Sequence, residues 1–347
     1  MEKFIRIGLD TSKRFFQLHG VDAAERPVLR RKMTRDQMIA FFRGLPPTLV
    51  GIEACGASHH WARRLQGFGH QVRLLPPQYV KPYVKRGKND AADAEAICEA
   101  MSRPSMRFVP IKSVEQQAGL MMQRTRALLV RQQTQVSNAI RGHAAELGII
   151  AAKGLSKTRT LLQQIARDQG VPENARQCFD LLGQRLDDLE RQIEALDKQL
   201  RTWHRGNECS RRLCGIPGVG ERTAAHCVMA VPDPHGFKSS RHFSAWVGLT
   251  PKDHSTAGRA RLGVITRAGD KHLRSLLVAG ATAVIQQVRR GRGQHSAWLV
   301  ELVKRKPPKL AAVALANKNA RTIWKLMISG EVYRPDHHVR APMANAA

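Results

Sequence analysis

Four acidic residues have types and positions suited to holding a metal ion. Asp90 and Asp93 lie in the alanine-rich stretch "KNDAADAEAI", where their spacing places both carboxylates on one face of a helix, about 5–6 Å apart. Asp10 and Glu53 come at or near the ends of two predicted strands. Four converging carboxylates would repel one another, and a divalent cation that prefers oxygen ligands would neutralise them. The sequence therefore predicts a Mg²⁺ site, with Mn²⁺ as an alternative ion.

Each of these acids also has an ordinary structural explanation. Asp10 fits a turn, Glu53 fits a strand end, Asp90 fits a helix N-cap, and Asp93 fits the first turn of a helix. The occurrence of all four in this order, in a strongly basic chain, favours the metal site. Two bound cations about 4 Å apart would support phosphoryl transfer, because one activates the attacking oxygen and the other stabilises the leaving one.

Short apolar runs in the first hundred residues predict the elements that position these acids. The first strand ends on Asp10, a later one carries Glu53, and a helix holds the aspartate pair. Two strands joined by a hairpin, followed by strands alternating with helices, favour one mixed α/β sheet. The predicted strands are residues 4–9, 14–22, 26–33, 48–54 and 70–76, and the predicted helices are 34–45, with Thr34 as N-cap, and 59–69.

The middle of the chain carries a heptad pattern. Residues 114–150 are predicted to form a long helix rich in Gln and Arg. Apolar residues then recur at alternating spacings of three and four, which favours a coiled coil over a simple amphipathic helix. The partner is either the preceding long helix or a second copy of the protein. The seam consists of Phe179, Leu182, Leu186, Leu189, Ile193, Leu196, Leu200 and Trp203.

Composition indicates a nucleic-acid partner. The 347 residues include 57 Lys and Arg against 28 Asp and Glu, a net charge of +29. Self-repulsion of this size destabilises a compact protein unless it binds a polyanion, usually nucleic acid. The six scattered cysteines include no C-x-x-C pair, which argues against a zinc module or a disulfide framework. Without a membrane-length apolar run or a signal peptide, the expected location is the cytoplasm.

A glycine-rich turn marks the start of the last third. Residues 208–231 read as helix, turn and helix, and the turn "GIPGVGERTA" has the glycine spacing of a helix-hairpin-helix. Gly218 and Gly220 would then present backbone N–H groups to a phosphate. The alternative is a tight turn in which both glycines serve geometry alone. Beyond it, 243–270 is predicted to be loop-rich, 271–290 and 309–328 helical, and the tail after Tyr333 disordered.

Ser255 is a candidate nucleophile in the stretch "PKDHSTAGRARLG". A lone serine is usually a turn residue, because a nucleophilic hydroxyl needs an activating partner. On chemistry alone, the neighbouring serines at 239, 240 and 244 are equal rivals. Lys252, Arg259 and Arg261 flank Ser255 and would stabilise charge that develops on a phosphate.

Several motifs together resemble those of the DEDD transposases of bacterial insertion sequences. The stretches "GLDTSK", "GIEACG", "KNDAADAEAI", "GIPGVGERTA" and "GLTPKDHSTAG" follow the order found in the IS110 family, with the IS1111 subgroup most similar. The resemblance covers about residues 4–330 and implies that Asp10, Glu53, Asp90 and Asp93 bind the metal. The implied domains are a RuvC-like (ribonuclease H-like) catalytic domain at 1–113, a helical coiled-coil segment at 114–207 for dimerisation and nucleic-acid contacts, a mainly helical transposase domain at 208–333 and a tail at 334–347.

The same resemblance implies a role for Ser255. The matching serine of the family is a nucleophile that becomes covalently joined to a DNA phosphate. It works beside the acidic site of another subunit, through an intermediate like a Holliday junction. This chain differs slightly from the family pattern. It has "HSTAG" where many relatives have two glycines. It also has one cation, Arg267, at a place where relatives often have two. The positions expected to contact nucleic acid are Gly218, Gly220, Lys252, Arg259, Arg261, Arg267 and Lys271.

The resemblance also implies the partners. Family members are guided by a structured non-coding RNA, the bridge RNA, whose loops pair with donor and target DNA, so base pairing supplies the sequence specificity. The basic segments 114–150, 288–294 and 303–309 suit contacts with RNA or DNA, although charge runs are often simply solvated. A homodimer or homotetramer is expected, acting on donor and target DNA in the bacterial cytoplasm at the nucleoid.

Two other functions fit the same residues. One is a Mg²⁺-dependent, structure-specific DNA nuclease of the Holliday-junction type, in which the acids suffice and Ser255 is structural. The other is a non-catalytic nucleic-acid scaffold built on the helix-hairpin-helix, in which Asp10→Asn would change nothing. The four ordered acids favour an enzyme over the scaffold.

Overall fold

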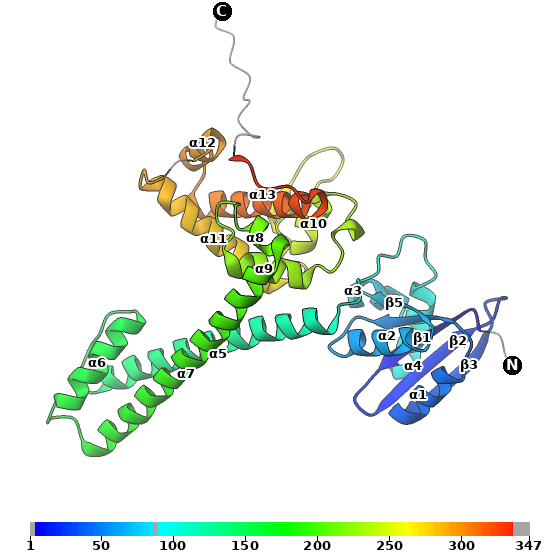
Figure 1. Ribbon diagram of the computed structural model, residues 1–347, viewed down its shortest axis with the longest axis horizontal. Coiled ribbons are helices and arrows are strands. Elements are labelled where there is room, and N and C mark those ends of the chain that lie inside the picture. The colour runs from blue at the N-terminus through cyan, green and yellow to red at the C-terminus, as the bar shows by residue number, and fades with distance from the viewer. Residues whose placement is uncertain (1–3, 86–88, 294, 336–347) are drawn as a thin grey trace, which may run out of the picture. The chain divides into compact units, whose positions relative to one another are not determined.

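A five-stranded mixed sheet organises the first part of the molecule. The computed structural model describes residues 4–85, 89–293 and 295–335, and the chain divides into two units, Met1–Val114 and Glu115–Ala347. The strand order is β3-β2-β1-β4-β5 (Figure 1). The predicted mixed sheet is confirmed and is consistent with a ribonuclease H-like domain. Its strands are β1 (Arg6–Thr11), β2 (Phe15–Val21), β3 (Pro27–Thr34), β4 (Leu49–Glu53) and β5 (Gln71–Leu75).

Strand direction follows from the connections. Strands β1, β2 and β3 form an antiparallel meander, whereas β1, β4 and β5 run parallel because helices cross between them. Helix α1 (Arg35–Arg43) begins at the predicted N-cap Thr34, which forms a capping box with Gln37. Helix α2 (Ser58–Gln66) ends three residues before the expected Gly69. After β5, the segment that leads to the aspartate pair contains two short turns of helix that the sequence did not predict, α3 (Pro77–Val80) and η1 (Lys81–Tyr83).

Helices cover both faces of the sheet. On one face, the apolar side chains of β1 and β2 pack with Met38 and Phe42 of α1 and Trp61 and Leu65 of α2. On the other face lies α4 (Asp90–Ala100), whose residue Ile97 is fully buried. Because side chains alternate along a strand, β1 directs Ile7 and Leu9 to the first face and Gly8 and Asp10 to the α4 face.

Two glycines allow α4 to lie directly on the sheet. A Cβ atom at Gly8 would come within 2.2 Å of the Ala94 carbonyl oxygen and 2.6 Å of the Cys98 nitrogen. On the neighbouring strand, a Cβ atom at Gly51 would lie 2.6 Å from the Met101 sulfur. The helix backbone therefore rests where larger side chains would hold it away, and its first turn reaches the end of β1.

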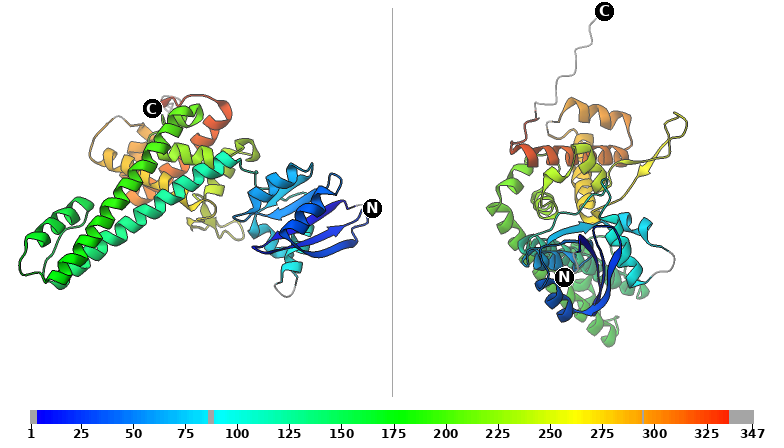
Figure 2. Two further views of the ribbon diagram at one scale, coloured as in Figure 1. Left: turned by 60° about the horizontal axis from the view of Figure 1, so that its bottom comes forward. Right: turned by 90° about the vertical axis from the view of Figure 1, so that its right-hand side faces the viewer.

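The heptad seam packs within the chain. Helices α5 (Val114–Glu146) and α7 (Glu173–Gly206) run side by side, with α6 (Leu155–Arg167) folded against them (Figures 1 and 2). Arg126 on α5 pairs with Asp197 on α7, with Nε 2.6 Å from Oδ1 and a second N–H to Oδ2 at 2.8 Å. Of the two partners considered for the seam, the preceding helix is thus the one in contact. The buried seam residues are Phe179, Leu186, Leu189, Ile193 and Leu200.

The last third forms a helical body around α11 and α13. Residues such as Leu277 on α11 and Ile323 on α13 are fully buried in its core. The stretch 243–270, predicted to be loop-rich, instead contains the end of α10 and a two-stranded ribbon, β6 (Pro251–Asp253) with β7 (Leu262–Ile265). The helices are α8 (Glu208–Leu213), α9 (Glu221–Ala230), η2 (Pro234–Gly236), α10 (Ser240–Val247), α11 (Lys271–Arg289), α12 (Ala297–Arg305) and α13 (Pro308–Ser329).

The structure differs from several sequence-based predictions in where helices end and in how many there are. Helix α5 ends at Glu146 rather than at residue 150, and helices α6 and α12 were not predicted. The basic segment 288–294 and the tail 334–347 lie partly outside the described residues, and residues 86–88, just before the aspartate pair, lie wholly outside them. None of the helices within the described ranges combines the length and the apolar composition of a membrane span.

Gly8→Ala should separate α4 from β1. The added methyl group overlaps backbone atoms that cannot move alone, and overpacking of this kind costs about 1–3 kcal/mol or more. Hydrogen exchange followed by mass spectrometry should show faster exchange across α4 in this variant. Gly56→Ala is the matched control, because a Cβ atom there meets nothing within 4 Å. Equal protection of α4 in both variants would contradict the packing described here.

Candidate active site

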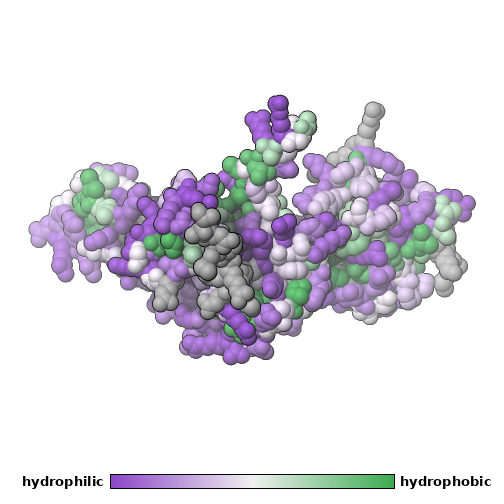
Figure 3. Space-filling view, turned by 90° about the horizontal axis from the view of Figure 1, so that it is seen from above, coloured by the Kyte–Doolittle hydropathy of each residue, from purple (hydrophilic) through white to green (hydrophobic). Residues whose placement is uncertain are grey.

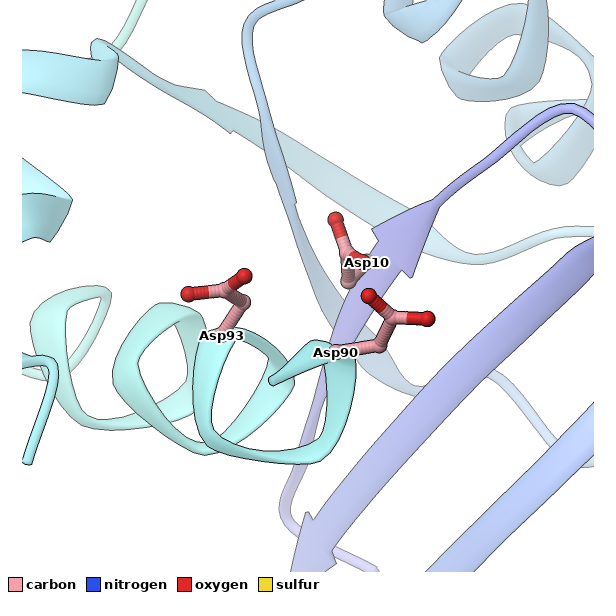
Figure 4. A group of neighbouring side chains, drawn as sticks. All are labelled: Asp10, Asp90 and Asp93. Atoms are coloured by element: carbon pink, nitrogen blue, oxygen red, sulfur yellow. The ribbon is translucent and has the colours of Figure 1, made fainter. Parts of the chain in front are cut away.

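Three aspartates meet at the end of β1. Asp10, Asp90 and Asp93 each offer a carboxylate oxygen, and these oxygens lie within 4.8 Å of one another. Figure 4 shows the three carboxylates gathered between β1 and the first turn of α4. Asp10 and Asp93 are half-buried, whereas Asp90 is exposed. The predicted convergence of Asp10 with the aspartate pair is therefore present in the structure.

The start of α4 is fixed by a residue that the sequence reading passed over. Asn89 is the N-cap, and its side-chain oxygen accepts a hydrogen bond from the Ala92 N–H at 2.8 Å. Capping therefore does not explain Asp90, so the alternative that made Asp90 the N-cap is wrong. An Asn directly before an alanine-rich helix was the available signal. Asp90 and Asp93 occupy the first turn, where the helix dipole favours negative charge.

Glu53 stands beside the three aspartates on the neighbouring strand. The parallel pairing of β1 with β4 sets Leu9 opposite Ile52, and Asp10 and Glu53 follow one residue later on each strand. Alternation directs both acids to the α4 face. The negative charge of Glu53 contributes to the raised pKa of Asp10. Its carboxylate is not in the group of three whose oxygens lie within 4.8 Å.

Burial and the neighbouring negative charges shift the pKa of Asp10. Burial, and then the charges of Asp93 and Asp90, raise the pKa of Asp10 from 3.8 to about 6, against the lowering effect of the Thr11 backbone N–H. An acid held in this way is costly to ionise unless a cation is near. The donors in the group are all carboxylate oxygens, which suits Mg²⁺ or Mn²⁺ rather than a thiophilic metal. Asp10, Asp90 and Asp93 thus fit a hard divalent cation.

Ser255 lies on the exposed ribbon of the second unit. The segment between β6 and β7 carries it, and Figure 2 (right) shows this ribbon projecting from the helical body. The Ser255 hydroxyl oxygen accepts the Arg261 backbone N–H at 3.0 Å, and the Ser255 N–H donates to Asp253 Oδ1 at 2.8 Å. Lys252, Arg259 and Arg261 lie exposed on the same ribbon. Of the rival serines, Ser239 caps α10 and Ser244 is buried.

The two glycines of the predicted helix-hairpin-helix differ in role. Gly218 has a φ of +83°, and its carbonyl oxygen would lie 1.9 Å from a Cβ atom at Gly280 on α11. It therefore serves turn geometry and close packing. A Cβ atom at Gly220 would meet nothing within 4 Å, and Gly220 starts α9 without a side-chain cap. Both glycines line a surface pocket that also includes Arg201 and Arg222.

Two further residues predicted to contact nucleic acid come just after the ribbon in the sequence. Arg267 is exposed with a φ of +57°, and its N–H donates to the Gly248 carbonyl at 3.1 Å. Lys271 is the exposed first residue of α11, which Asp270 caps. Both cations belong to the second unit together with Ser255. Each unit therefore carries part of the predicted chemistry, the acids in the first and the serine in the second.

A proton and a divalent cation should compete for Asp10. Because the pKa of Asp10 is about 6, Mn²⁺ affinity should fall by about tenfold for each pH unit below 6 and change little above pH 7. Calorimetric titrations with Mn²⁺ at pH 5.0, 6.0 and 7.5 would measure this. An affinity that is the same at all three pH values would contradict it.

Asp10→Asn should uncouple stability from metal binding. A raised pKa means that ionisation of Asp10 opposes folding as pH rises from about 4 to about 6. At pH 7.5 the metal-free variant should therefore be more stable, by about 1 kcal/mol once solvent screening is allowed for, yet gain nothing from Mn²⁺. Urea unfolding with and without Mn²⁺ tests both points. Asp36→Asn, an exposed acid on α1, is the control and should retain the Mn²⁺ response.

Known proteins match nearly the whole chain. Residues 7–148 match the family model for the DEDD transposase of IS110 elements, and residues 210–296 match the transposase IS116/IS110/IS902 family. The putative transposase y4pF/y4sB of Sinorhizobium fredii is 61% identical over 96% of this chain and 87% of its own length. The transposase for insertion sequence element IS1111A of Coxiella burnetii is 38% identical over 94% of this chain and 91% of its own length.

A more distant relative is named for a different rearrangement of DNA. The pilin gene-inverting protein of Moraxella lacunata is 25% identical over 67% of this chain and 66% of its own length. The four acids fall within the first family match and Ser255 within the second. The extent of both matches, and the identity to relatives over nearly their full length, establish that this chain belongs to the IS110 family of transposases and is an enzyme that acts on DNA.

Proposed function

We propose that this transposase cuts and rejoins DNA strands with a divalent-metal site on Asp10, Asp90, Asp93 and Glu53, and with Ser255 as a covalent nucleophile. The convergence of three carboxylates at the end of β1 carries this proposal. A bound Mg²⁺ would stabilise negative charge on the reacting phosphate oxygens. The protein's own part is to hold the carboxylates at a fixed separation, through the packing of α4 on β1. We assign this chemistry to a RuvC-like domain at residues 1–113.

Ser255 supports rejoining as well as cutting. A covalent phosphoserine keeps the energy of the broken phosphodiester, so that a second strand can displace the serine without any further energy source. The exposed ribbon makes the hydroxyl accessible to a DNA backbone, and the nearby cations Lys252, Arg259 and Arg261 suit the charge on the phosphate. A relative named for gene inversion favours this scheme, because inversion requires both cutting and rejoining.

The nucleic-acid contacts are expected on the second unit. Figure 3 shows a predominantly hydrophilic face, with hydrophobic residues in small separate groups, which suits a chain with a net charge of +29. The N-terminus of α9 at Gly220 has no side-chain cap, and its pocket is lined by Arg201 and Arg222 together with the acids Asp197 and Glu221. The backbone N–H groups and the two arginines would hold a backbone phosphate there. Arg267 and Lys271 extend the basic surface next to the ribbon. Such contacts position DNA or RNA without reading sequence.

Specificity is assigned to a guide RNA. The resemblance to bridge-RNA-guided transposases supports this assignment, with the RNA pairing to donor and target DNA while the protein reads backbone and shape. We further propose that two or four copies assemble, with the serine of one copy acting beside the acids of another. The helical segment 114–207 would contribute to that assembly and to nucleic-acid contacts, while the helical body at 208–333 serves as the transposase domain.

Ser255→Ala should abolish recombination. If the hydroxyl forms the covalent bond, the variant gives no protein–DNA adduct and no rejoined product, a loss of at least about 10³-fold. Denaturing gels of a labelled DNA duplex that spans the end of the parent element would show this. Ser240→Ala, a neighbouring serine at the start of α10, is the matched control and should retain activity. Cleavage that persists in Ser255→Ala would favour the junction-type nuclease, in which the acids suffice.

A discrete RNA should accompany the purified protein. The gene expressed with its native flanking DNA should yield one structured RNA that maps beside the gene, because a guide is retained by specific contacts. Sequencing of the co-purified RNA provides the measurement. A mixture of host RNAs without such a species would mean that the positive charge binds RNA indiscriminately, and guided recognition would be contradicted.

A further inference from the structure

A surface pocket lies between α13 and the segment that follows it, the red end of the chain in Figure 1. Helix α13 ends at Gly330, whose φ of +71° turns the chain, and residues 331–334 then form the second wall. The pocket has a volume of about 370 Å³, at the small end of the range of about 300–1,000 Å³ for ligand pockets. None of the described residues that line it belongs to the acidic site, the ribbon or the glycine-rich turn.

The helix wall of this pocket is cationic. Lys318, Arg321 and Lys325 line it, and their spacing of three and four residues places them on one face of α13. At about 1.5 Å of rise per residue, the three extend over about 10 Å of helix. Arg334 adds a fourth cation from the second wall, and Glu331 is the single acid among the described lining residues. The pocket therefore carries an excess of positive charge that suits an anionic ligand.

Two of these cations are half-buried without an anion beside them. Lys318 Nζ lies 4.1 Å from the ring centroid of Trp298 on α12, and burial together with the charge of Arg321 lowers the pKa of Lys318. Arg321 Nε is buried and has no hydrogen-bond partner among the described residues. In the part of the chain that the structure describes, neither cation forms an ion pair with a carboxylate. Uncompensated burial of charge costs free energy, so a bound anion would stabilise this arrangement.

The pocket also offers aromatic surface. Trp324 lines it and is held by a hydrogen bond from its Nε1 to the Pro234 carbonyl oxygen at 2.9 Å. Tyr333 lines the second wall and is half-buried, and its Cβ atom lies 3.5 Å from where a Cβ atom at Gly215 would stand. Packing therefore holds both rings in place. Proteins bind unpaired nucleotides with this combination, because bases stack on aromatic rings while cations follow the backbone.

We propose that this pocket, the α13 pocket, binds an unpaired nucleotide of a nucleic-acid strand, with the base against Trp324 and Tyr333 and the phosphate on Arg321 and its neighbouring lysines. A base stacked and paired within a duplex does not fit a pocket of this size. The inference rests on the proposed nucleic-acid contacts of the second unit and adds single-stranded nucleic acid as the class of ligand. RNA and DNA share this chemistry, so the strand belongs either to the guide RNA or to DNA that has been displaced from its partner strand.

Photo-crosslinking locates an unpaired nucleotide directly. The probes are single strands of about eight nucleotides, one of RNA with a central 4-thiouridine and one of DNA with a central 4-thiothymidine. The full-length protein, washed free of nucleic acid at high salt, is mixed with each probe and with an excess of unlabelled duplex DNA, which occupies surfaces that hold paired strands. We expect at least one probe to give cross-links within residues 322–334, mapped by mass spectrometry.

Neutral replacements test which contacts hold the nucleotide. Arg321→Gln and Lys325→Gln should each lower the yield of this cross-link by about tenfold, the loss expected for one charge-assisted contact to a phosphate. Lys325 is exposed, so its replacement leaves the core intact even if Arg321→Gln disturbs folding. Arg31→Gln removes the same charge from the exposed surface of the edge strand β3 and should keep the yield within about twofold of wild type.

The outcomes separate this inference from the contacts on which it rests. Cross-links confined to other segments, or an unchanged yield in both pocket variants, would overturn the α13 pocket while nucleic-acid binding by the second unit stands. No cross-link anywhere in residues 115–347 and no binding of duplex DNA would overturn the proposed contacts themselves. A pocket cross-link with the RNA probe alone would assign the pocket to the guide RNA, and one with the DNA probe alone would assign it to a displaced DNA strand.

Discussion

The close approach of α4 to β1 is the constraint on which the acidic site depends. Three contacts in a row fix the register: Arg6 Nε donates to the Cys98 carbonyl at 3.1 Å, Gly8 packs under Ala94, and Asp10 meets the aspartate pair. Two residues of a strand advance about 6.6 Å and four residues of a helix about 6 Å. Every second residue of β1 therefore faces every fourth residue of α4. A slip of one helical residue would turn Asp90 and Asp93 away from Asp10.

The serine is presented in a different way, on the exposed ribbon that joins α10 to α11. Gly248 and Gly269 allow the chain to cross itself beneath the ribbon, where a Cβ atom at Gly269 would stand 1.8 Å from the Trp246 carbonyl oxygen. Asp270, at the end of this crossing, accepts two backbone N–H groups of α11 and lies 3.0 Å from buried His226 Nε2. Ser255 is therefore exposed on the ribbon, while close backbone contacts hold the ends of the ribbon against the helical body.

Sequence reasoning predicted the features that depend on local pattern. The strands that carry Asp10 and Glu53 followed from apolar runs, Thr34 from capping chemistry, and the facing of Asp90 with Asp93 from helical spacing. The heptad seam required a helical partner, but its spacing is satisfied equally by α5 or by a second chain, so only the structure identifies α5. The short helix α10 was missed because the turn residues that follow it, Gly248 onward, dominated that stretch.

Features that depend on long-range contact could not be predicted. Nothing in the sequence distinguishes Gly8, which admits α4, from Gly56, which faces open space. Nor does the sequence show that the Ser255 hydroxyl accepts the Arg261 backbone N–H, because that contact depends on how the ribbon folds back on itself. The guide RNA and the assembly of several copies rest on resemblance, since they concern partners rather than the folding of this chain.

The location of a bound cation tests the central claim most directly. Crystals of the protein soaked in Mn²⁺ and measured at the manganese absorption edge would reveal each bound ion as an anomalous peak. We predict a strong peak within coordination distance of Asp10, Asp90 and Asp93, and its loss in Asp10→Asn. Occupied Mn²⁺ sites elsewhere, with no peak among these three carboxylates, would contradict a metal centre at the end of β1.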